Sequence, residues 1–287
     1  MPLTKCIACI AALFFCSPLL AQDKVNVSTY SFSHDYKTGE KISYAFEDVD
    51  YEYSAVLNEG FYTVNDFQNA QEIQVRVDET VVEENGTERK QFTISDAKYR
   101  KITNGKDGLS AGELTPVAKL IPGFPETITY TCALNEGDFL AAILKAYQPY
   151  MSNPLGVFLY YKMMDVHTFG PTVANLNPQS LETMKIAPSK DMELANGKFH
   201  NHSPITLFQR IDTINGSPQA YFKIMTMGNY YQTIGNGRID TNYQYTFHVS
   251  MDGPYKGLLF DGELQEHVFA HNAKAIISRQ LSIRRLD

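Results

Sequence analysis

Residues 72–96, EIQVRVDETVVEENGTERKQFTISD, decide the fold class because they carry a complete β-hairpin signal. Apolar and polar residues alternate on both sides of Asn85-Gly86. This dipeptide is favoured in two-residue type I′ turns, since both turn positions take a positive φ. A turn there brings Val77 opposite Ile94, and both lie on the apolar face. Pattern and turn therefore predict the same antiparallel hairpin.

The C-terminal part of the chain repeats this alternation in longer segments. RIDTNYQYTFHVSM (238–251) keeps a period of two along its length, which is typical of a half-buried strand. LLFDGELQEHVFA (258–270) and AIISRQLSI (275–283) follow after turn signals, and Gly262 is expected to mark a bend or bulge. Three long neighbouring strands predict a β-meander, and strands of this length normally curl.

The middle of the chain is helical in pattern. Residues 137–151 are rich in Ala and Leu and carry apolar residues at helical spacing. Asn153-Pro154 then supplies an N-cap and a first-turn proline for a second helix through residue 169. A third, short helix is predicted at residues 180–184. The expected buried stripe of the second helix consists of Leu155, Phe158, Leu159, Met163 and Val166.

Together these patterns predict a mainly β (α+β) fold, in which long antiparallel meander strands form a curled sheet or half-barrel. A helical hairpin is inserted near residues 137–169. The first interpretation is one β-rich domain over residues 22–287, because the helices need cover from a sheet. The alternative is two β subdomains, residues 22–134 and 190–287, bridged by the helices.

The first 21 residues predict export. Lys5 precedes an apolar run of ten residues, and Ala21 supplies a small residue at the expected cleavage point. The run is too short to span about 30 Å of hydrocarbon, so no transmembrane anchor is expected after cleavage. The mature chain is predicted to be soluble and periplasmic or secreted.

Cysteine count and charge narrow the class further. Of the four cysteines only Cys132 lies beyond the predicted leader, so no intrachain disulfide is possible, and a bacterial periplasm suits such a chain. The net charge of −7 argues against a nucleic-acid partner, since phosphate binding needs clustered Lys and Arg. No P-loop, dinucleotide, EF-hand or H-E-x-x-H motif occurs, the one C-x-x-C (Cys6 to Cys9) lies within the predicted leader, and no cofactor is predicted.

GLSAG (108–112) matches the G-x-S-x-G pattern of the α/β-hydrolase nucleophile elbow. That elbow needs a strand before the serine and a helix directly after it. Here TNGKDG precedes the motif, and Pro116 comes too early for a helix interior. We therefore interpret the segment as a flexible link, and catalysis by Ser110 as the disfavoured alternative.

The histidines offer a second chemistry. His200 and His202 have the alternate spacing of some zinc sites, which makes them the candidate metal ligands. His248, His267 and His271 lie on or beside the C-terminal strands, near acids such as Asp261. Hydrogen-bonded or solvent-facing histidines explain the same pattern, and this interpretation is preferred.

The aromatic content suggests a ligand site, since the chain has 18 Tyr, 17 Phe and no Trp. In a curled sheet closed by helices, aromatic side chains can line a cavity for an apolar small molecule or lipid. An ordinary aromatic core fits the pattern equally. The predicted ligand-binding residues are Phe139, Ile143, Phe158, Tyr161, Tyr243, Tyr245 and Phe247.

This inferred plan, a leader followed by a curled sheet with a helical plug, is similar to that of periplasmic lipid and lipoprotein carriers, although no motif supports the resemblance. The sequence thus favours an exported, non-enzymatic envelope protein that binds a hydrophobic or amphipathic ligand or an envelope partner. The alternative is a secreted hydrolase, metal-assisted through histidines or based on Ser110. These two functions differ in whether the fold holds an apolar cavity or an open cleft with convergent polar groups.

Overall fold

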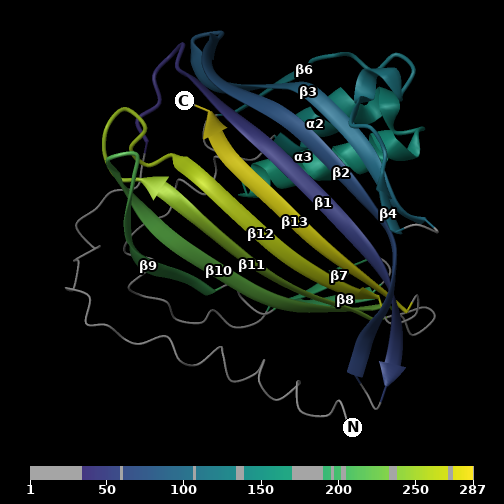
Figure 1. The fold of residues 1–287 in the computed structure, drawn as a ribbon. Coiled ribbons are helices and arrows are strands. Elements are labelled where there is room, and N and C mark those ends of the chain that lie inside the picture. Colours follow the sequence, from purple (N-terminus) through teal and green to yellow (C-terminus); the bar gives the residue numbers. More distant parts are fainter. Residues whose placement is uncertain are drawn as a thin grey trace.

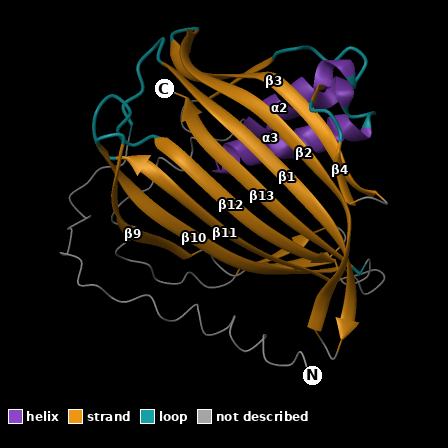
Figure 2. Ribbon diagram, viewed as in Figure 1, coloured by secondary structure: helices purple, strands orange, loops and turns teal. Residues whose placement is uncertain are grey.

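The structure, a computed structural model, describes residues 34–58, 61–105, 108–133, 139–169, 190–194, 197–201, 205–232, 238–270 and 274–286. These residues form one curled antiparallel sheet of 13 strands, with two α-helices on one face (Figures 1 and 2). The predicted fold class is therefore confirmed. The predicted leader and the short helix expected at 180–184 lie outside the described residues.

The strand order across the sheet is β4-β3-β2-β1-β13-β12-β11-β10-β8-β7, with β5 and β6 paired to β3 and β9 paired to β10. This order is an open path, so the sheet curls without its ends pairing. The strands are β1 (Lys41–Asn58), β2 (Phe61–Glu84), β3 (Thr87–Gly105), β4 (Gly108–Ala111), β5 (Thr115–Pro116), β6 (Ile128–Ala133), β7 (Lys190–Leu194), β8 (Gly197–Asn201), β9 (Ile205–Ile214), β10 (Ser217–Gln232), β11 (Arg238–Ser250), β12 (Leu259–Ala270) and β13 (Ala275–Leu286).

The hairpin predicted from residues 72–96 is the β2–β3 hairpin. Val77 pairs with Ile94, as the two-residue turn requires. Asn85 and Gly86 take φ values of 54° and 75°, which explains the choice of these two residues. The predicted register is confirmed.

The centre of the sheet joins its first and last described strands. β1 pairs with β13 from Ser43 opposite Leu286 to Ser54 opposite Ala275. On its other side β1 pairs with β2, so residues near both ends of the described chain lie in the middle of the sheet. Figure 1 shows this pairing as the purple strand beside the yellow one.

The predicted three-strand meander is confirmed as β11–β12–β13, and β10 pairs with its outer strand β11. The irregularity expected at Gly262 lies two residues earlier on β12, where the pairing passes from His248–Asp261 to Val249–Leu259 and skips Phe260. Gly262 itself is needed for a different reason. The ring of Tyr245 lies against the Gly262 backbone. A Cβ at that position would lie 2.5 Å from the Tyr245 hydroxyl oxygen. Glycine is therefore required by close packing.

The two helices are α2 (Phe139–Tyr147) and α3 (Pro154–Phe169), joined by a 3₁₀ turn at Gln148–Tyr150. Asn153 caps α3, since its side-chain oxygen accepts a hydrogen bond of 2.9 Å from the Leu155 backbone N–H. The predicted helical hairpin and its N-cap are confirmed. Both helices lie behind β1, β2 and β3 in Figure 2, and α2 contacts β6.

Alternation along the strands divides the sheet into two faces. On β1, Tyr44, Phe46 and Asp48 project toward the helices, on what we call the helix face; Ala45 and Glu47 project to the opposite, open face. The hydrophobic core lies on the helix face. Its buried members include Tyr44, Phe46, Val75, Val77, Phe92, Ile94, Ile143, Tyr147, Leu159, Met163, Phe222, Tyr245, Phe247, Leu264 and Ile283.

The GLSAG segment forms β4, a short strand at one end of the sheet order. Ser110 pairs with Thr103 of β3, and its side chain is exposed. The interpretation of this segment as a flexible link was wrong, because pairing with the long β3 strand holds it extended. A strand does not leave Ser110 on the strand-to-helix turn that a nucleophile elbow needs.

Candidate functional site

A groove of about 780 Å³ crosses the open face of the sheet. Its floor is low in the middle because small side chains stand there, among them Ala45, Ser282 and Thr246. Charged and aromatic side chains rise around them. The groove is lined from β3 to β9 by Ala45, Phe46, Glu47, Gln74, Val75, Arg76, Asp96, Lys98, Arg210, Tyr221, Thr246, His248, Asp261, Gly262, Glu263, Ser282, Ile283, Arg284 and Leu286.

Strand register arranges these residues in two parallel rows, because cross-strand partners lie side by side on one face. The first row, from β2 to β9, is Arg76, Ala45, Arg284, Asp261, His248, Tyr221 and Arg210. The second row lies on the same face and is displaced from the first by two residues on every strand. From β2 to β10 it is Gln74, Glu47, Ser282, Glu263, Thr246 and Lys223.

His248 in the first row is held between two carboxylates. Its Nδ1 lies 2.6 Å from Asp261 Oδ1, and its Nε2 lies 3.1 Å from Asp212 Oδ2. Burial by itself would lower the pKa of His248, but hydrogen bonds and charge attraction from Asp261 and Asp212 outweigh burial and raise it. The imidazolium form donates to both acids. Because both ring nitrogens are engaged, this histidine is arranged to hold a charge in place, and neither nitrogen is open to a substrate.

Two further groups extend the His248 arrangement. The Tyr221 ring lies 4.8 Å from the His248 ring, and the Arg210 guanidinium stands 4.3 Å from the Tyr221 centroid. Arg210 also donates to Asp212 at 2.9 Å. Burial tends to raise the pKa of Asp212, yet bonds to Arg210 and His248 lower it overall. This end of the groove is therefore built from fixed charges stacked on an aromatic ring.

Four other charged side chains of the groove are available to interact with a ligand. In the described part of the chain, the side chains of Lys98, Glu47, Glu263 and Arg284 form no ion pair, although all four line the groove. Asp261, the cross-strand neighbour of Arg284, bonds His248 instead. The groove thus presents both signs of charge, and the side chains of Tyr221 and Leu286 add apolar surface, which suits a ligand with charged and apolar parts.

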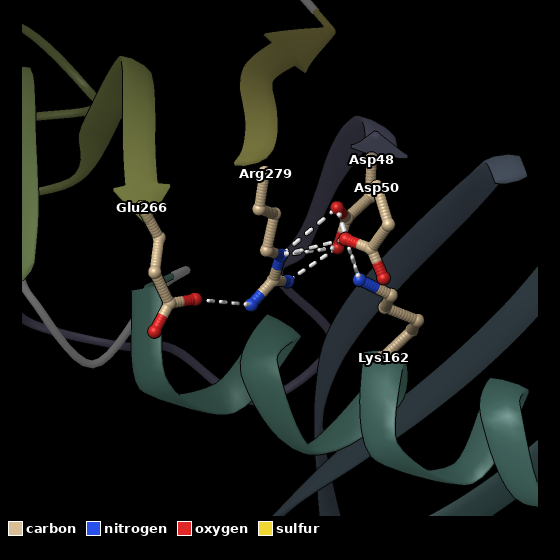
Figure 3. Close-up of polar contacts among 5 residues, drawn as sticks. All are labelled: Asp48, Asp50, Lys162, Glu266 and Arg279. Atoms are coloured by element: carbon tan, nitrogen blue, oxygen red, sulfur yellow. Dashed lines mark hydrogen bonds and ion pairs between the residues drawn. The ribbon is translucent and has the colours of Figure 1, made fainter. Parts of the chain in front are cut away.

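The helix face carries a second polar cluster, formed by Asp48, Asp50, Lys162, Glu266 and Arg279 (Figure 3). Lys162 of α3 lies 2.7 Å from Asp50 and 3.2 Å from Asp48. Arg279 of β13 contacts Asp48 and lies 3.6 Å from Glu266 of β12.

The centre of this cluster is closed to solvent, since Asp48, Lys162 and Arg279 have side-chain exposures of 5–9%, while Asp50 and Glu266 at its margin are each 24% exposed. It ties α3 to three strands, while burial leaves little room for a ligand. Its function is to fasten the helices to the sheet. The groove, which is open and partly unpaired, is the candidate functional site.

The predicted ligand-binding residues lie on the helix face and its helices. Tyr245 and Phe247 are brought together, with ring centroids 4.9 Å apart, and both are fully buried in the core. Ile143 of α2 is also fully buried. Phe158 of α3 is half-buried against the ring of Tyr99 on β3.

Tyr161 is 59% exposed and packs against Tyr160 on the same helix. Phe139 is the first residue of α2, and Tyr243 lies within β11. The structure does not describe the side chain of either residue. Of the five predicted residues whose side chains are described, none lines the groove.

The structure describes the two candidate metal ligands only in part. His200 lies in β8 opposite Asn229 and Asp191, without a described side chain, and His202 lies outside the described residues. Among the residues that the structure describes, no group of three or more His, Cys, Asp or Glu side chains is placed to hold a metal ion.

Sequence reasoning found part of the groove and missed the rest. His248 and Asp261 stood out as polar residues on neighbouring strands, and the structure pairs them. Ala45, Ser282 and Arg284 were missed. Their only signal is membership of the polar face of an alternating strand, and this becomes a site only when distant strands pair in register.

No protein-family model matches the chain, and no curated protein matches it. Among solved structures, a lipovitellin structure that reports lipid–protein interactions matches at 7% identity and a TM-score of 0.38, over 88% of this chain and 26% of that one. This chain therefore spans about a quarter of the lipovitellin chain. A DUF1329 family protein from Desulfovibrio piger matches at 7% identity and a TM-score of 0.14, over 86% of each chain. Both are remote likenesses.

Within the described residues, no helix has the length and apolar character needed to cross a membrane.

Proposed function

We propose that the protein is exported and, as a non-enzymatic binding protein of the cell envelope, holds an amphipathic ligand in the open-face groove. The observation that carries this proposal is the groove itself, about 780 Å³ in volume. Ligand pockets typically measure about 300–1,000 Å³, so this volume accommodates a lipid-sized or drug-sized molecule.

The chemistry of the lining supports an amphipathic ligand over a purely apolar one. Phe46, Val75 and Ile283 border the groove, but their side chains lie in the core on the helix face. The side chains of Tyr221 and Leu286 give the groove apolar surface, while Lys98 and Arg284 are among its charged groups. A purely apolar molecule would bury these charges without partners, which is unfavourable. A molecule with polar and apolar parts satisfies both kinds of surface.

The groove is an open cleft with polar groups, the form expected for the hydrolase alternative, but the state of His248 supports binding over catalysis. A general base needs a free nitrogen within reach of the proton that it removes. Both His248 nitrogens are bonded to Asp261 and Asp212, and these bonds raise the pKa of His248. The arrangement serves better as a fixed positive wall of a binding site.

The binding proposal is tested by filling the groove from its floor. Ser282 is exposed on β13, and Ser282→Trp places an indole in the middle of the groove. Ser278→Trp is the matched control, since Ser278 lies on the same face of β13, four residues earlier and outside the lining. The probe is the amphipathic dye 1-anilinonaphthalene-8-sulfonate, followed by fluorescence.

We expect saturable dye binding by the parent protein, at least a tenfold loss of affinity in Ser282→Trp, and a change of less than twofold in Ser278→Trp. Circular dichroism checks that both variants fold. Equal affinity of all three proteins would contradict binding in the groove. Mass spectrometry of material that co-purifies with the parent, and is missing from Ser282→Trp, then identifies the natural ligand.

Export is tested separately. The full chain is expressed in a bacterial host, and the envelope fraction is purified for N-terminal sequencing. We expect the mature chain to begin at Gln22, after cleavage behind Ala21. A protein that remains in the cytoplasm with residues 1–21 attached would contradict export and leave the groove experiment unaffected.

A further inference from the structure

We infer that the groove recognises a zwitterionic head group, with its anionic part over Ala45 and its cationic part over Ser282. This inference rests on the proposed function and names the ligand class for the same site. It follows from the two-row register, in which each small residue stands between two side chains of like charge on neighbouring strands.

The anion position is defined by the first row. Ala45 of β1 has Arg76 of β2 on one side and Arg284 of β13 on the other. The Arg76 side chain is held in place, since its Nε lies 3.0 Å from Asp78 Oδ1 and its Nη2 lies 3.2 Å from Ser43 Oγ. The methyl group of Ala45 leaves room between the two guanidinium groups, which suit a phosphate or carboxylate.

The cation position is defined by the second row. Ser282 of β13 has Glu47 of β1 on one side and Glu263 of β12 on the other. Both glutamates are exposed, and neither forms an ion pair in the described part of the chain. Two carboxylates across a small polar residue attract an ammonium group, and the serine hydroxyl adds an acceptor.

The two positions are diagonal neighbours on the sheet. Adjacent strands are about 4.8 Å apart and two residues along a strand span about 6.7 Å, so the positions are about 8 Å apart. Arg and Glu side chains are long enough to contact a head group that spans this distance. A molecule with only one charge satisfies one position and leaves the other pair of like charges facing each other across the groove.

The apolar lining supplies the remainder of the site. Leu286, which lies on the same face of β13 two residues beyond Arg284, and the Tyr221 ring contribute apolar side chains to the lining. A zwitterionic amphiphile therefore has a place for its phosphate, its ammonium group and the start of its chain. Charge complementarity of this kind determines specificity more than it determines total affinity.

The test compares four amphiphiles that share a dodecyl chain: dodecylphosphocholine, dodecyl phosphate, dodecyltrimethylammonium and dodecyl maltoside. Each is titrated below its critical micelle concentration against the mature protein purified from the envelope, by calorimetry. We expect dodecylphosphocholine to bind at least fivefold more tightly than any of the other three. Ser282→Trp should lower the affinity for every amphiphile that binds to the parent protein.

Charge-neutralising variants assign the two positions. The double variant Glu47→Gln/Glu263→Gln should lower the affinity for dodecylphosphocholine at least fivefold. Its affinity for dodecyl phosphate should be equal to that of the parent or higher. Arg284→Gln should weaken dodecylphosphocholine and dodecyl phosphate together. Glu126→Gln, at an exposed position outside the lining, is the control and should change neither.

The possible failures are distinguishable. If all four amphiphiles bind equally and Ser282→Trp blocks them, the groove is a binding site and the zwitterion inference is overturned. If the glutamate variant leaves the order of affinities unchanged, the cation position is overturned. If none of the four binds, the proposed function falls with the inference.

Discussion

Asp48 on β1 and Arg279 on β13 form a buried ion pair although 231 residues separate them in the sequence. Lys162 of α3 joins the same carboxylate at 3.2 Å, so one acidic side chain links two strands and a helix. Asp50 and Glu266 complete a cluster of three carboxylates and two cations (Figure 3). The helix pair is thus fastened to the sheet by charges as well as by apolar contacts.

Arg279→Met tests this fastening. The variant leaves three carboxylates, of which Asp48 is buried, with Lys162 as the remaining cation of the cluster. Breaking a buried ion pair costs about 3–5 kcal/mol. We expect a loss of that size in the free energy of unfolding, measured by urea denaturation. Arg284→Met is the matched control: it removes an exposed arginine of the same strand, and a change within about 0.5 kcal/mol is expected. Equal losses in both variants would contradict a special contribution from the cluster.

His248 makes stability depend on pH. Its pKa is raised above the ordinary value of 6.5, so its stabilising contribution is fully present below pH 6.5 and is lost as the pH rises through the folded-state pKa. The difference in unfolding free energy between the parent and His248→Gln should therefore be greatest near pH 5.5 and shrink toward pH 9. Urea titrations at several pH values measure it.

An NMR titration of the His248 ring supplies the direct check of the same prediction. Its midpoint should lie above 6.5, and Asp261→Asn should move the midpoint down because that change removes the nearest negative charge. A midpoint at or below 6.5 in the parent would contradict the arrangement between two carboxylates.

Gly262→Ala should destabilise the protein by about 1–3 kcal/mol, the usual cost of overpacking. The new Cβ would meet the Tyr245 hydroxyl oxygen at 2.5 Å and ring carbon Cε2 at 2.8 Å. Tyr245→Leu removes the ring. In the Tyr245→Leu background, the loss of stability caused by Gly262→Ala should fall to less than half. A double-mutant cycle followed by thermal melting measures this difference. The same cost in both backgrounds would place the strain elsewhere.

Asn153→Ala should cost about 1 kcal/mol, because it removes the side-chain acceptor at the start of α3. Asn153→Asp keeps an acceptor and places a negative charge at the helix N-terminus, so it should retain the parent stability. The free energies of both variants are compared by denaturant unfolding. A loss shared by the two variants would show that the cap does not stabilise α3.

Local features of this fold were predictable from the sequence. The β2–β3 register follows from Asn85-Gly86 and a period of two, and the start of α3 follows from Asn153-Pro154. In each case the information lies within a few neighbouring residues. The meander strands belong to the same group, since their alternation continues over a whole strand.

Features that depend on distant pairing were not predictable. Leu159 and Met163 of the predicted α3 stripe are indeed buried, yet Lys162 between them is buried as well, because it meets Asp48 and Asp50 on β1. Helical spacing alone shows no such partner. The groove is a similar case, since its rows exist only once five or more strands have found their register.

The pairing of β1 with β13 also determines when the sheet can be completed. The central ladder needs residues 41–54 and residues 275–286 at the same time, so it forms only after nearly the whole described chain has been synthesised. Contacts of such large sequence separation make folding slow. A chain that stops before Ala275 would leave β1 as an exposed edge, open to pairing with other molecules. The complete sheet can therefore form only after β13 is available to β1, whatever local hairpins have formed before.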